Sequence, residues 1–201
     1  MKTDVATHSA LKSTHKRGRP REFDPDDAFL QVRICFSRRG YAATSIDDLS
    51  DATGLARPSL YRAFGDKRAM FLRALDREYE ELTDRLERAK LVGPVPLRLS
   101  AFYQAARSSY VTTGTTRAVG VAFGAALADA TDDVDVTHRL QQFHSAIEAA
   151  AFDILGPNVS SVMGQMLSAL AIGACVKARV GADSFEEADI AMLARILTTT
   201  P

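Results

Sequence analysis

The side chains best suited to recognition chemistry lie close together, between Arg57 and Arg62. Arg57 carries a planar guanidinium whose paired N–H groups match guanine O6 and N7. Ser59, Tyr61 and Arg62 can bond bases or phosphates. Pro58 falls in the first turn of the expected helix, where a missing N–H costs little. The set predicts contact with DNA; the alternatives are core packing for Tyr61 and a solvated helix face for Arg62.

Two short helices joined at Gly54 are expected to position these side chains. Thr44 is expected to cap the first helix, with Asp47 at the capping-box position. On the first helix, Ile46, Leu49 and Ala52 recur at spacings of three and are expected to form a buried stripe. Leu55 and Leu60 are expected to pack the second helix onto this stripe. This arrangement predicts a helix-turn-helix, and the alternative is an ordinary αα-hairpin.

The flanking segments favour the helix-turn-helix. A preceding helix is expected from Asp24-Pro25 to Gly40, with acids in its first turn and arginines in its last. A long following helix is expected to be capped by Asp66 and to begin near Lys67. Its buried face repeats at helical spacing through Phe71, Leu75, Tyr79, Leu82 and Leu86.

Residues 1–22 are expected to form a disordered arm with a basic end. Gly18 and Pro20 oppose a helix there. With Lys12, the arm carries the cations Lys16, Arg17, Arg19 and Arg21 and could follow a DNA minor groove. The alternative is a tail that only aids solubility.

The composition is that of a folded protein, with 201 residues, 46% hydrophobic, 25% charged and no formal net charge. Residues 1–90 carry 18 basic and 15 acidic residues, against 7 and 10 in residues 91–201. Cys35 and Cys175 are expected to be buried free thiols in a reducing compartment. No apolar run is long enough to span a bilayer, and the start lacks a signal-peptide core, so a cytoplasmic location is predicted.

The second half of the chain is also expected to be helical, so the predicted fold class is all-α. Residues Val92 to Pro96 break the helical pattern and predict a boundary between a domain over 23–92 and a domain over 93–201. The further helices are expected over 97–113, 117–130, from Asp132 or Asp133 to Gly156, from Asn158 to Gly181, and after Ser184.

The first half resembles the N-terminal domain of TetR/AcrR-family transcriptional regulators over about residues 18–90. The motifs occur in this order: Gly18-Arg19-Pro20, Phe36-x-x-x-Gly40-Tyr41-x-x-Thr44-Ser45-Ile46-x-x-Leu49, Ala52-x-Gly54-Leu55 and Leu60-Tyr61-x-x-Phe64-x-x-Lys67. The chain departs at Ala56, where the family has a capping Ser or Thr.

The resemblance implies roles for the motif residues. Thr44 and Ser45 would contact phosphate, and Lys67 would hold the DNA backbone. Base edges would be met by Arg57, Pro58 and Ser59, and phosphate or a thymine methyl by Tyr61 and Arg62.

The resemblance also implies a homodimer in which the last two helices pair with their copies. Small and apolar residues predict that interface, namely Val162, Met166, Ala169, Gly173, Val176, Ile190, Leu193 and Leu197. The alternative is that both helices pack inside one subunit.

An effector pocket is implied in the centre of the second domain. Its candidate lining is Phe102, Tyr103, Arg107, Tyr110, Phe123, Phe143, His144 and Met163. The alternative is plain core. The expected effector is small and apolar or amphipathic, and no cofactor is expected.

Catalytic and metal-binding signals are weak. His144 and Glu148 lie four apart, but such a pair is usually a surface hydrogen bond, and no nucleophile or phosphate-cradling motif occurs. The prediction is a non-enzymatic, ligand-responsive repressor that binds a palindromic operator as a dimer. The alternatives are an activator or ligand-independent regulator and, more distantly, a helical carrier or enzyme.

Overall fold

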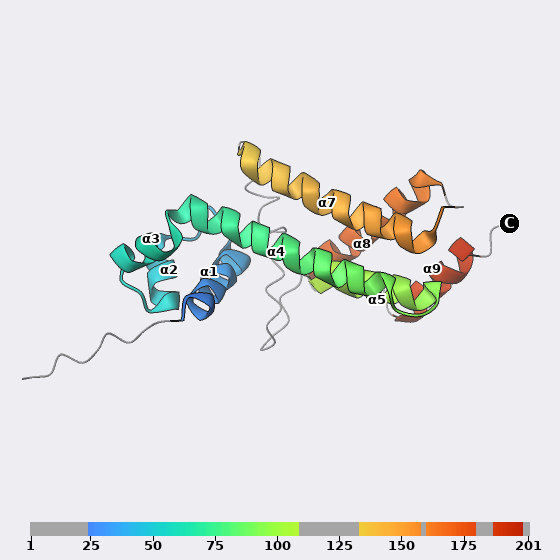
Figure 1. The fold of residues 1–201 in the computed structure, drawn as a ribbon, viewed down its shortest axis with the longest axis horizontal. Helices are drawn as coiled ribbons and strands as arrows, with labels where there is room; N and C mark the ends of the chain where they lie inside the picture. The colour runs from blue at the N-terminus through green and yellow to red at the C-terminus, as the bar shows by residue number, and fades with distance from the viewer. Residues whose placement is uncertain (1–23, 109–132, 158–159, 180–186, 199–201) are drawn as a thin grey trace, which may run out of the picture.

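The computed structural model describes residues 24–108, 133–157, 160–179 and 187–198, and these form helices joined by turns, without a strand. Figure 1 shows an elongated molecule with a small helical cluster at one end and a longer bundle at the other, linked by one long helix. The helices are α1 (Pro25–Arg39), α2 (Ile46–Thr53), α3 (Arg57–Phe64), α4 (Lys67–Lys90), α5 (Val95–Ser108), α7 (Val134–Leu155), α8 (Ser161–Arg179) and α9 (Glu187–Thr198). The all-α prediction is confirmed for the described residues.

The first cluster packs α1, α2 and α3 against the start of α4 around an aromatic core. Phe36 lies fully buried, with its ring centroid 5.1 Å from that of Phe71 on α4. Asp24 caps α1 by accepting from the backbone N–H groups of residues 26 and 27, and Gly40 ends it with φ of 78°. The predicted bounds of α1 are therefore confirmed, because both caps are local sequence features.

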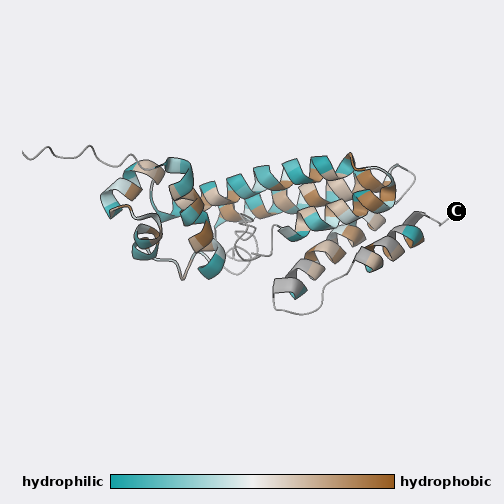
Figure 2. Ribbon diagram, turned by 90° about the horizontal axis from the view of Figure 1, so that it is seen from below, coloured by the Kyte–Doolittle hydropathy of each residue, from teal (hydrophilic) through white to brown (hydrophobic). Residues whose placement is uncertain are grey.

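The helix α4 continues from this cluster into the second half of the molecule. Asp66 caps it by accepting from the Ala69 N–H at 2.7 Å, as predicted. Its buried face includes Phe71, Leu75, Leu82 and Leu86, whereas Tyr79 is only half-buried. Figure 2 shows the outward sides of α4 as mostly hydrophilic.

A buried ionic network joins α1 to α4. Arg33 donates to both oxygens of Glu81 at 2.8 and 2.7 Å, and its Nη2 lies 3.3 Å from Glu78 Oε2. Arg85 donates to the other oxygen of Glu78 at 3.0 Å. Because Glu78 is only 1% exposed, the network places charge inside the α1–α4 junction, and these partners satisfy it.

Ion pairs also join α4 to α7. Arg68 donates from Nε and Nη2 to the two oxygens of Asp133 at 2.8 and 2.9 Å. Arg139 holds Asp76 in the same bidentate way at 2.6 and 3.0 Å. Further along, Lys90 lies 3.0 Å from Asp153. The partners follow one another in the same chain direction, so α4 and α7 run parallel, side by side in Figure 1.

Several predicted bounds in the second half can be compared with the structure. Asp133 caps α7 and Gly156 ends it, as predicted, whereas α5 begins at Val95 rather than at 97. The predicted helix over 117–130 and the caps Asn158 and Ser184 lie outside the described residues. Among the described helices, none combines the length and hydropathy needed to cross a membrane.

Candidate nucleic-acid interface

Ser45 is the N-cap of α2, so the prediction that Thr44 caps this helix is wrong by one residue. Ser45 Oγ accepts from the Asp48 N–H at 3.1 Å, and the Asp48 carboxylate accepts from the Ser45 N–H at 2.8 Å. Thr44 instead donates its hydroxyl to the Gly40 carbonyl at 2.6 Å and is only 1% exposed. Of the two residues expected to meet phosphate, Ser45 is therefore the exposed one.

The turn between α2 and α3 has the predicted geometry. Gly54 adopts φ of 68° in the left-handed region, where a Cβ would be strained even though no atom lies within 4 Å of it. Ala56 occupies the N-cap of α3 without a side-chain hydrogen bond. Its carbonyl accepts from the Ser59 and Leu60 N–H groups at 2.8 and 3.0 Å, so the first turn of α3 is closed by backbone bonds alone.

The helix α3 has one buried and one exposed face. Leu60 and Phe64 are buried against the cluster, and Ser59 is half-buried. The exposed side chains include Tyr61 at 45%, which rules out the core-packing alternative for that residue in this structure. With it are exposed Arg57, Pro58 and Arg62. Apart from the half-buried Ser59, the residues predicted to contact DNA from this helix are therefore accessible to a partner.

Acidic side chains from α2 partner the arginines of this surface. Arg57 Nε donates to Asp47 Oδ1 at 2.6 Å, and Arg57 Nη2 pairs with the same oxygen. Arg39 pairs with Asp48. The pKa of Asp48 is lowered, first by hydrogen bonds from Ser45 and then by Arg39. Both carboxylates lie in the first turn of α2, where negative charge is also favoured by the helix dipole.

Lys67 and Arg68 at the start of α4 make different contacts. The Lys67 ammonium lies 4.4 Å from the centroid of the Tyr41 ring, in cation–π geometry. Arg68 turns towards α7, where it pairs with Asp133 and Asp135. Lys67 is therefore engaged within the first helical cluster, whereas Arg68 is engaged by the second half of the molecule. The arm residues Lys16, Arg17, Arg19 and Arg21 lie outside the described residues.

The pairing of Arg57 with Asp47 is the feature of this surface that the sequence analysis missed. The capping role predicted for Asp47 belongs to Asp48. The two partners are ten positions apart on different helices, so only the angle between α2 and α3 brings them together. A weak signal was present in the sequence: the first turn of α2 contains an acid that the cap does not use, and the next helix, α3, begins with an arginine.

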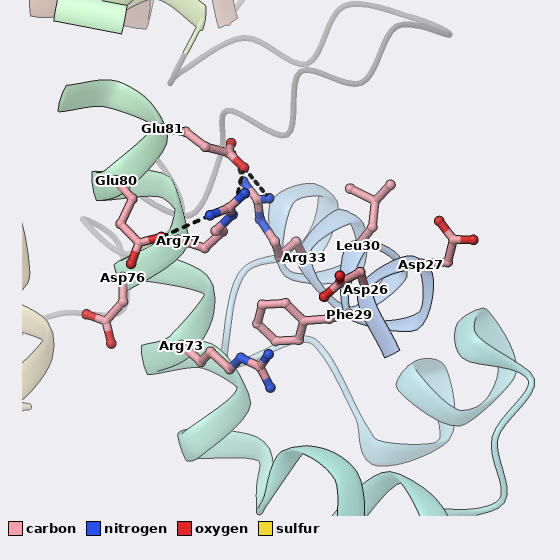
Figure 3. A pocket seen from close by; sticks show the side chains of 10 residues that line it. All are labelled: Asp26, Asp27, Phe29, Leu30, Arg33, Arg73, Asp76, Arg77, Glu80 and Glu81. Carbon is pink, nitrogen blue, oxygen red and sulfur yellow. Dashed lines mark hydrogen bonds and ion pairs between the residues drawn. The ribbon is translucent and has the colours of Figure 1, made fainter. Parts of the chain in front are cut away.

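A groove runs between α1 and α4 beside the ionic network (Figure 3). Figure 3 shows the Arg73 guanidinium beside Phe29, and its carbon lies 4.3 Å from that ring centroid. The groove is lined mainly by charged residues of both signs, including Asp26, Asp76 and Arg77. None of the predicted effector residues that the structure describes lines it. The charged lining makes this groove a poor match to the apolar or amphipathic ligand expected from the sequence.

The predicted effector residues occupy the interior of the second half. Phe102, Tyr103 and Phe143 are buried, and Met163 is half-buried. Arg107 Nε and His144 Nε2 are buried and make no hydrogen bond among the described residues. Burial lowers the pKa of His144.

Only some of the residues predicted to line the effector pocket border the same cavity. Phe102 and Tyr103 border a small apolar cavity shared with Ile190 and Leu193, whereas Phe143, His144 and Met163 do not line it. Tyr110 and Phe123 lie outside the described residues.

The residues predicted for the dimer interface also separate into two groups. Val162 is 57% exposed, and Met166, Ala169 and Gly173 are exposed with it on α8. Ile190 is buried within the subunit, because α9 packs this residue against α5, and Leu193 is half-buried. Ile190 therefore packs inside its own subunit, whereas Leu193 stays partly accessible and its place in a dimer interface remains a prediction. The side chains of Val176 and Leu197 lie outside the described residues.

Fold and surface together define a helix-turn-helix protein whose small helical cluster is joined through α4 to a larger helical bundle. The model of bacterial regulatory proteins of the tetR family matches residues 33–74, which run from α1 into α4, so this segment is similar to the DNA-binding segment of that family. The predicted family resemblance is thereby confirmed for this segment.

Curated relatives match about a third of the chain. The HTH-type transcriptional repressor ComR of Escherichia coli K12 is 42% identical over 73 residues, covering 36% of this chain and 35% of ComR. The HTH-type transcriptional repressor BdcR of the same organism is 38% identical over 65 residues, covering 32% and 33%. The matched stretch thus spans about a third of these relatives.

Solved structures extend the likeness of fold to most of the chain. The reduced form of E. coli NemR superposes with a TM-score of 0.69 at 19% identity, covering 86% of this chain and 95% of NemR. The regulator FadR of Bacillus subtilis, in complex with stearoyl-CoA, superposes with a TM-score of 0.61 at 10% identity, covering 87% and 95%. At these identities the likeness shows the fold alone.

Proposed function

We propose that this protein is a transcriptional repressor that binds a palindromic operator as a dimer through α3. The observation that carries the proposal is the exposed face of α3, on which Arg57, Tyr61 and Arg62 project away from the buried Leu60 and Phe64. A helix with one anchored face and one accessible face of hydrogen-bond donors suits insertion into a major groove. Repression rather than activation is supported by the names of ComR and BdcR.

The proposal divides the molecule into a basic arm over 1–22, a DNA-binding domain over 23–92 and an effector and dimerisation domain over 93–201. Exposed apolar residues support dimerisation through the last helices: Val162, Met166 and Leu170 on α8, with Met192 and Ile196 on α9. Exposed apolar patches of this kind commonly mark protein interfaces. In a dimer, the two α3 helices would read successive major grooves about 34–36 Å apart.

An effector site between α5 and α7 completes the proposal. Buried polar atoms without a partner are rare, and Arg107 Nε and His144 Nε2 are two of them among the described residues. A ligand that supplies hydrogen-bond acceptors to Arg107 and buries an apolar part beside Phe143 would satisfy this environment. FadR, which shares the fold, is solved with stearoyl-CoA. An effector acts only if it binds the two conformations of the protein with different affinity.

The test begins with duplexes that the wild-type protein selects from a random DNA pool at near-physiological salt. Arg57→Ala should lose about 1–3 kcal/mol of operator binding and relax the preference at one base in each half-site. Arg88→Ala removes an exposed arginine near the far end of α4 and is the matched control. Equal discrimination by wild type and Arg57→Ala would remove Arg57 from base readout, and failure to enrich any sequence would refute the proposed function.

A further inference from the structure

An acidic side chain sits directly beside the arginine expected to read bases. Asp47 Oδ1 accepts from Arg57 Nε at 2.6 Å and also pairs with Nη2. Capping of α2 does not require this carboxylate, because Ser45 and Asp48 form the capping box. A carboxylate on a surface that meets phosphates opposes binding to any DNA sequence. Its presence therefore calls for a role connected with Arg57.

The hydrogen-bond geometry leaves part of the guanidinium accessible. A guanidinium has five N–H donors arranged along two usable edges. Asp47 occupies the edge formed by Nε and Nη2. The remaining edge, formed by Nη1 and the second hydrogen of Nη2, has the fork geometry that matches guanine O6 and N7. Arg57 can thus keep its pair with Asp47 while it binds a guanine.

We propose that Asp47 is a specificity-determining residue, which restrains Arg57 for base readout and opposes its transfer to phosphate. This inference rests on the proposed function, since it assumes that α3 enters the major groove. On operator DNA, Arg57 bonds guanine through its open edge and the ion pair persists. On other DNA, the open edge meets no guanine. Turning the Arg57 side chain out of the groove towards a phosphate then breaks its ion pair, and the Asp47 carboxylate faces phosphates without its partner.

The strength of the pair suits this role. The side chains of Arg57 and Asp47 are 59% and 63% exposed, so solvent screens their attraction. The pair therefore orients the guanidinium without holding it so firmly that contact with DNA is prevented. Asp47 should act mainly by weakening the binding of sequences that offer Arg57 no guanine.

The test compares a duplex selected by the wild-type protein with a scrambled duplex of the same composition. Asp47→Asn should tighten binding to the scrambled duplex about tenfold and to the selected duplex about twofold, because only non-operator binding is opposed by both the charge and the restraint. The ratio of the two dissociation constants should fall about fivefold. Asp51→Asn removes the same charge from an exposed position one turn further along α2, and it should tighten both duplexes by the same factor.

A second comparison isolates the contact between the two side chains. In an Arg57→Ala background, Asp47→Asn should change both affinities equally, because no guanidinium remains to be restrained. Thermal melting of each variant checks that α2 and α3 remain folded. If wild type discriminates between the duplexes and Asp47→Asn keeps the full ratio, Asp47 is only a surface charge. If wild type does not discriminate, the proposed function fails and this inference fails with it.

Discussion

Replacing Arg33 with Met should test whether the ionic network at the α1–α4 junction stabilises the fold. Met keeps most of the apolar volume of the arginine stem while removing the donors to Glu81 and Glu78. Removing one member of a buried ion pair costs about 3–5 kcal/mol. Because Glu78 retains Arg85 and Glu81 is 29% exposed, we expect a loss near the lower end, about 3 kcal/mol.

The assay is urea unfolding followed by circular dichroism at neutral pH. Arg77→Met is the matched control, since Arg77 is 56% exposed and pairs only with Glu80 and Glu81 on its own helix in the contacts described. It should cost less than about 0.5 kcal/mol. A loss for Arg33→Met no larger than that of the control would refute the reasoning.

The same variant carries a pH signature through Glu81. Burial raises the pKa of this carboxyl, but the hydrogen bonds and charge of Arg33, with the charges of Arg77 and Arg85, outweigh it and lower the pKa overall. A lowered carboxyl pKa contributes stability above the unfolded value of about 4.3, and this is lost as pH falls through the folded value. The stability difference between wild type and Arg33→Met should therefore shrink on acidification, and a constant difference would contradict the role of charge.

Further predictions concern the turn and the contacts between the two halves. Gly54→Ala should destabilise by about 1 kcal/mol because φ is 68° there, measured by thermal melting, and an unchanged melting temperature would show that the turn relaxes. Ala56→Ser should add about 1 kcal/mol by capping α3, and no gain in urea midpoint would mean that the backbone bonds already suffice. A double-mutant cycle of Asp76→Asn and Arg139→Gln should give a coupling of about 0.5 kcal/mol that fades at 1 M salt. A salt-independent coupling would argue against an ion pair that solvent screens.

Features encoded by neighbouring residues could be predicted from the sequence. The bounds of α1 follow from Asp24-Pro25 and Gly40, and the start of α4 follows from Asp66, because each cap acts within its own turn. Thr44 failed as the cap because two hydroxyl residues stand side by side and either can cap a helix. The choice is made by the fold, which buries Thr44 against the Gly40 carbonyl and leaves Ser45 to begin α2.

Features that depend on helices far apart in sequence could not be predicted. Arg33 and Glu81 are 48 positions apart, and Arg68 and Asp133 are 65 apart. Each of these residues looks, on its own helix, like an ordinary solvated charge. Similarly, Ile190 fits an apolar stripe that could face either a second subunit or its own, and only the packing of α9 on α5 places it inside.

The ion pairs between α4 and α7 have a mechanical consequence. With 24 residues, α4 is a rod about 36 Å long, and a tilt of about 5° would move one end by about 3 Å. Without partners, α4 could tilt relative to the rest of the molecule. Ion pairs of Arg68, Asp76 and Lys90 join it to the parallel helix α7 near both ends of α4 and part-way along it. Two parallel helices joined at three points resist sliding along one another, so they move together as one rigid unit. A displacement of α7 would therefore move α4 with it, and α4 would carry the movement to the helix-turn-helix.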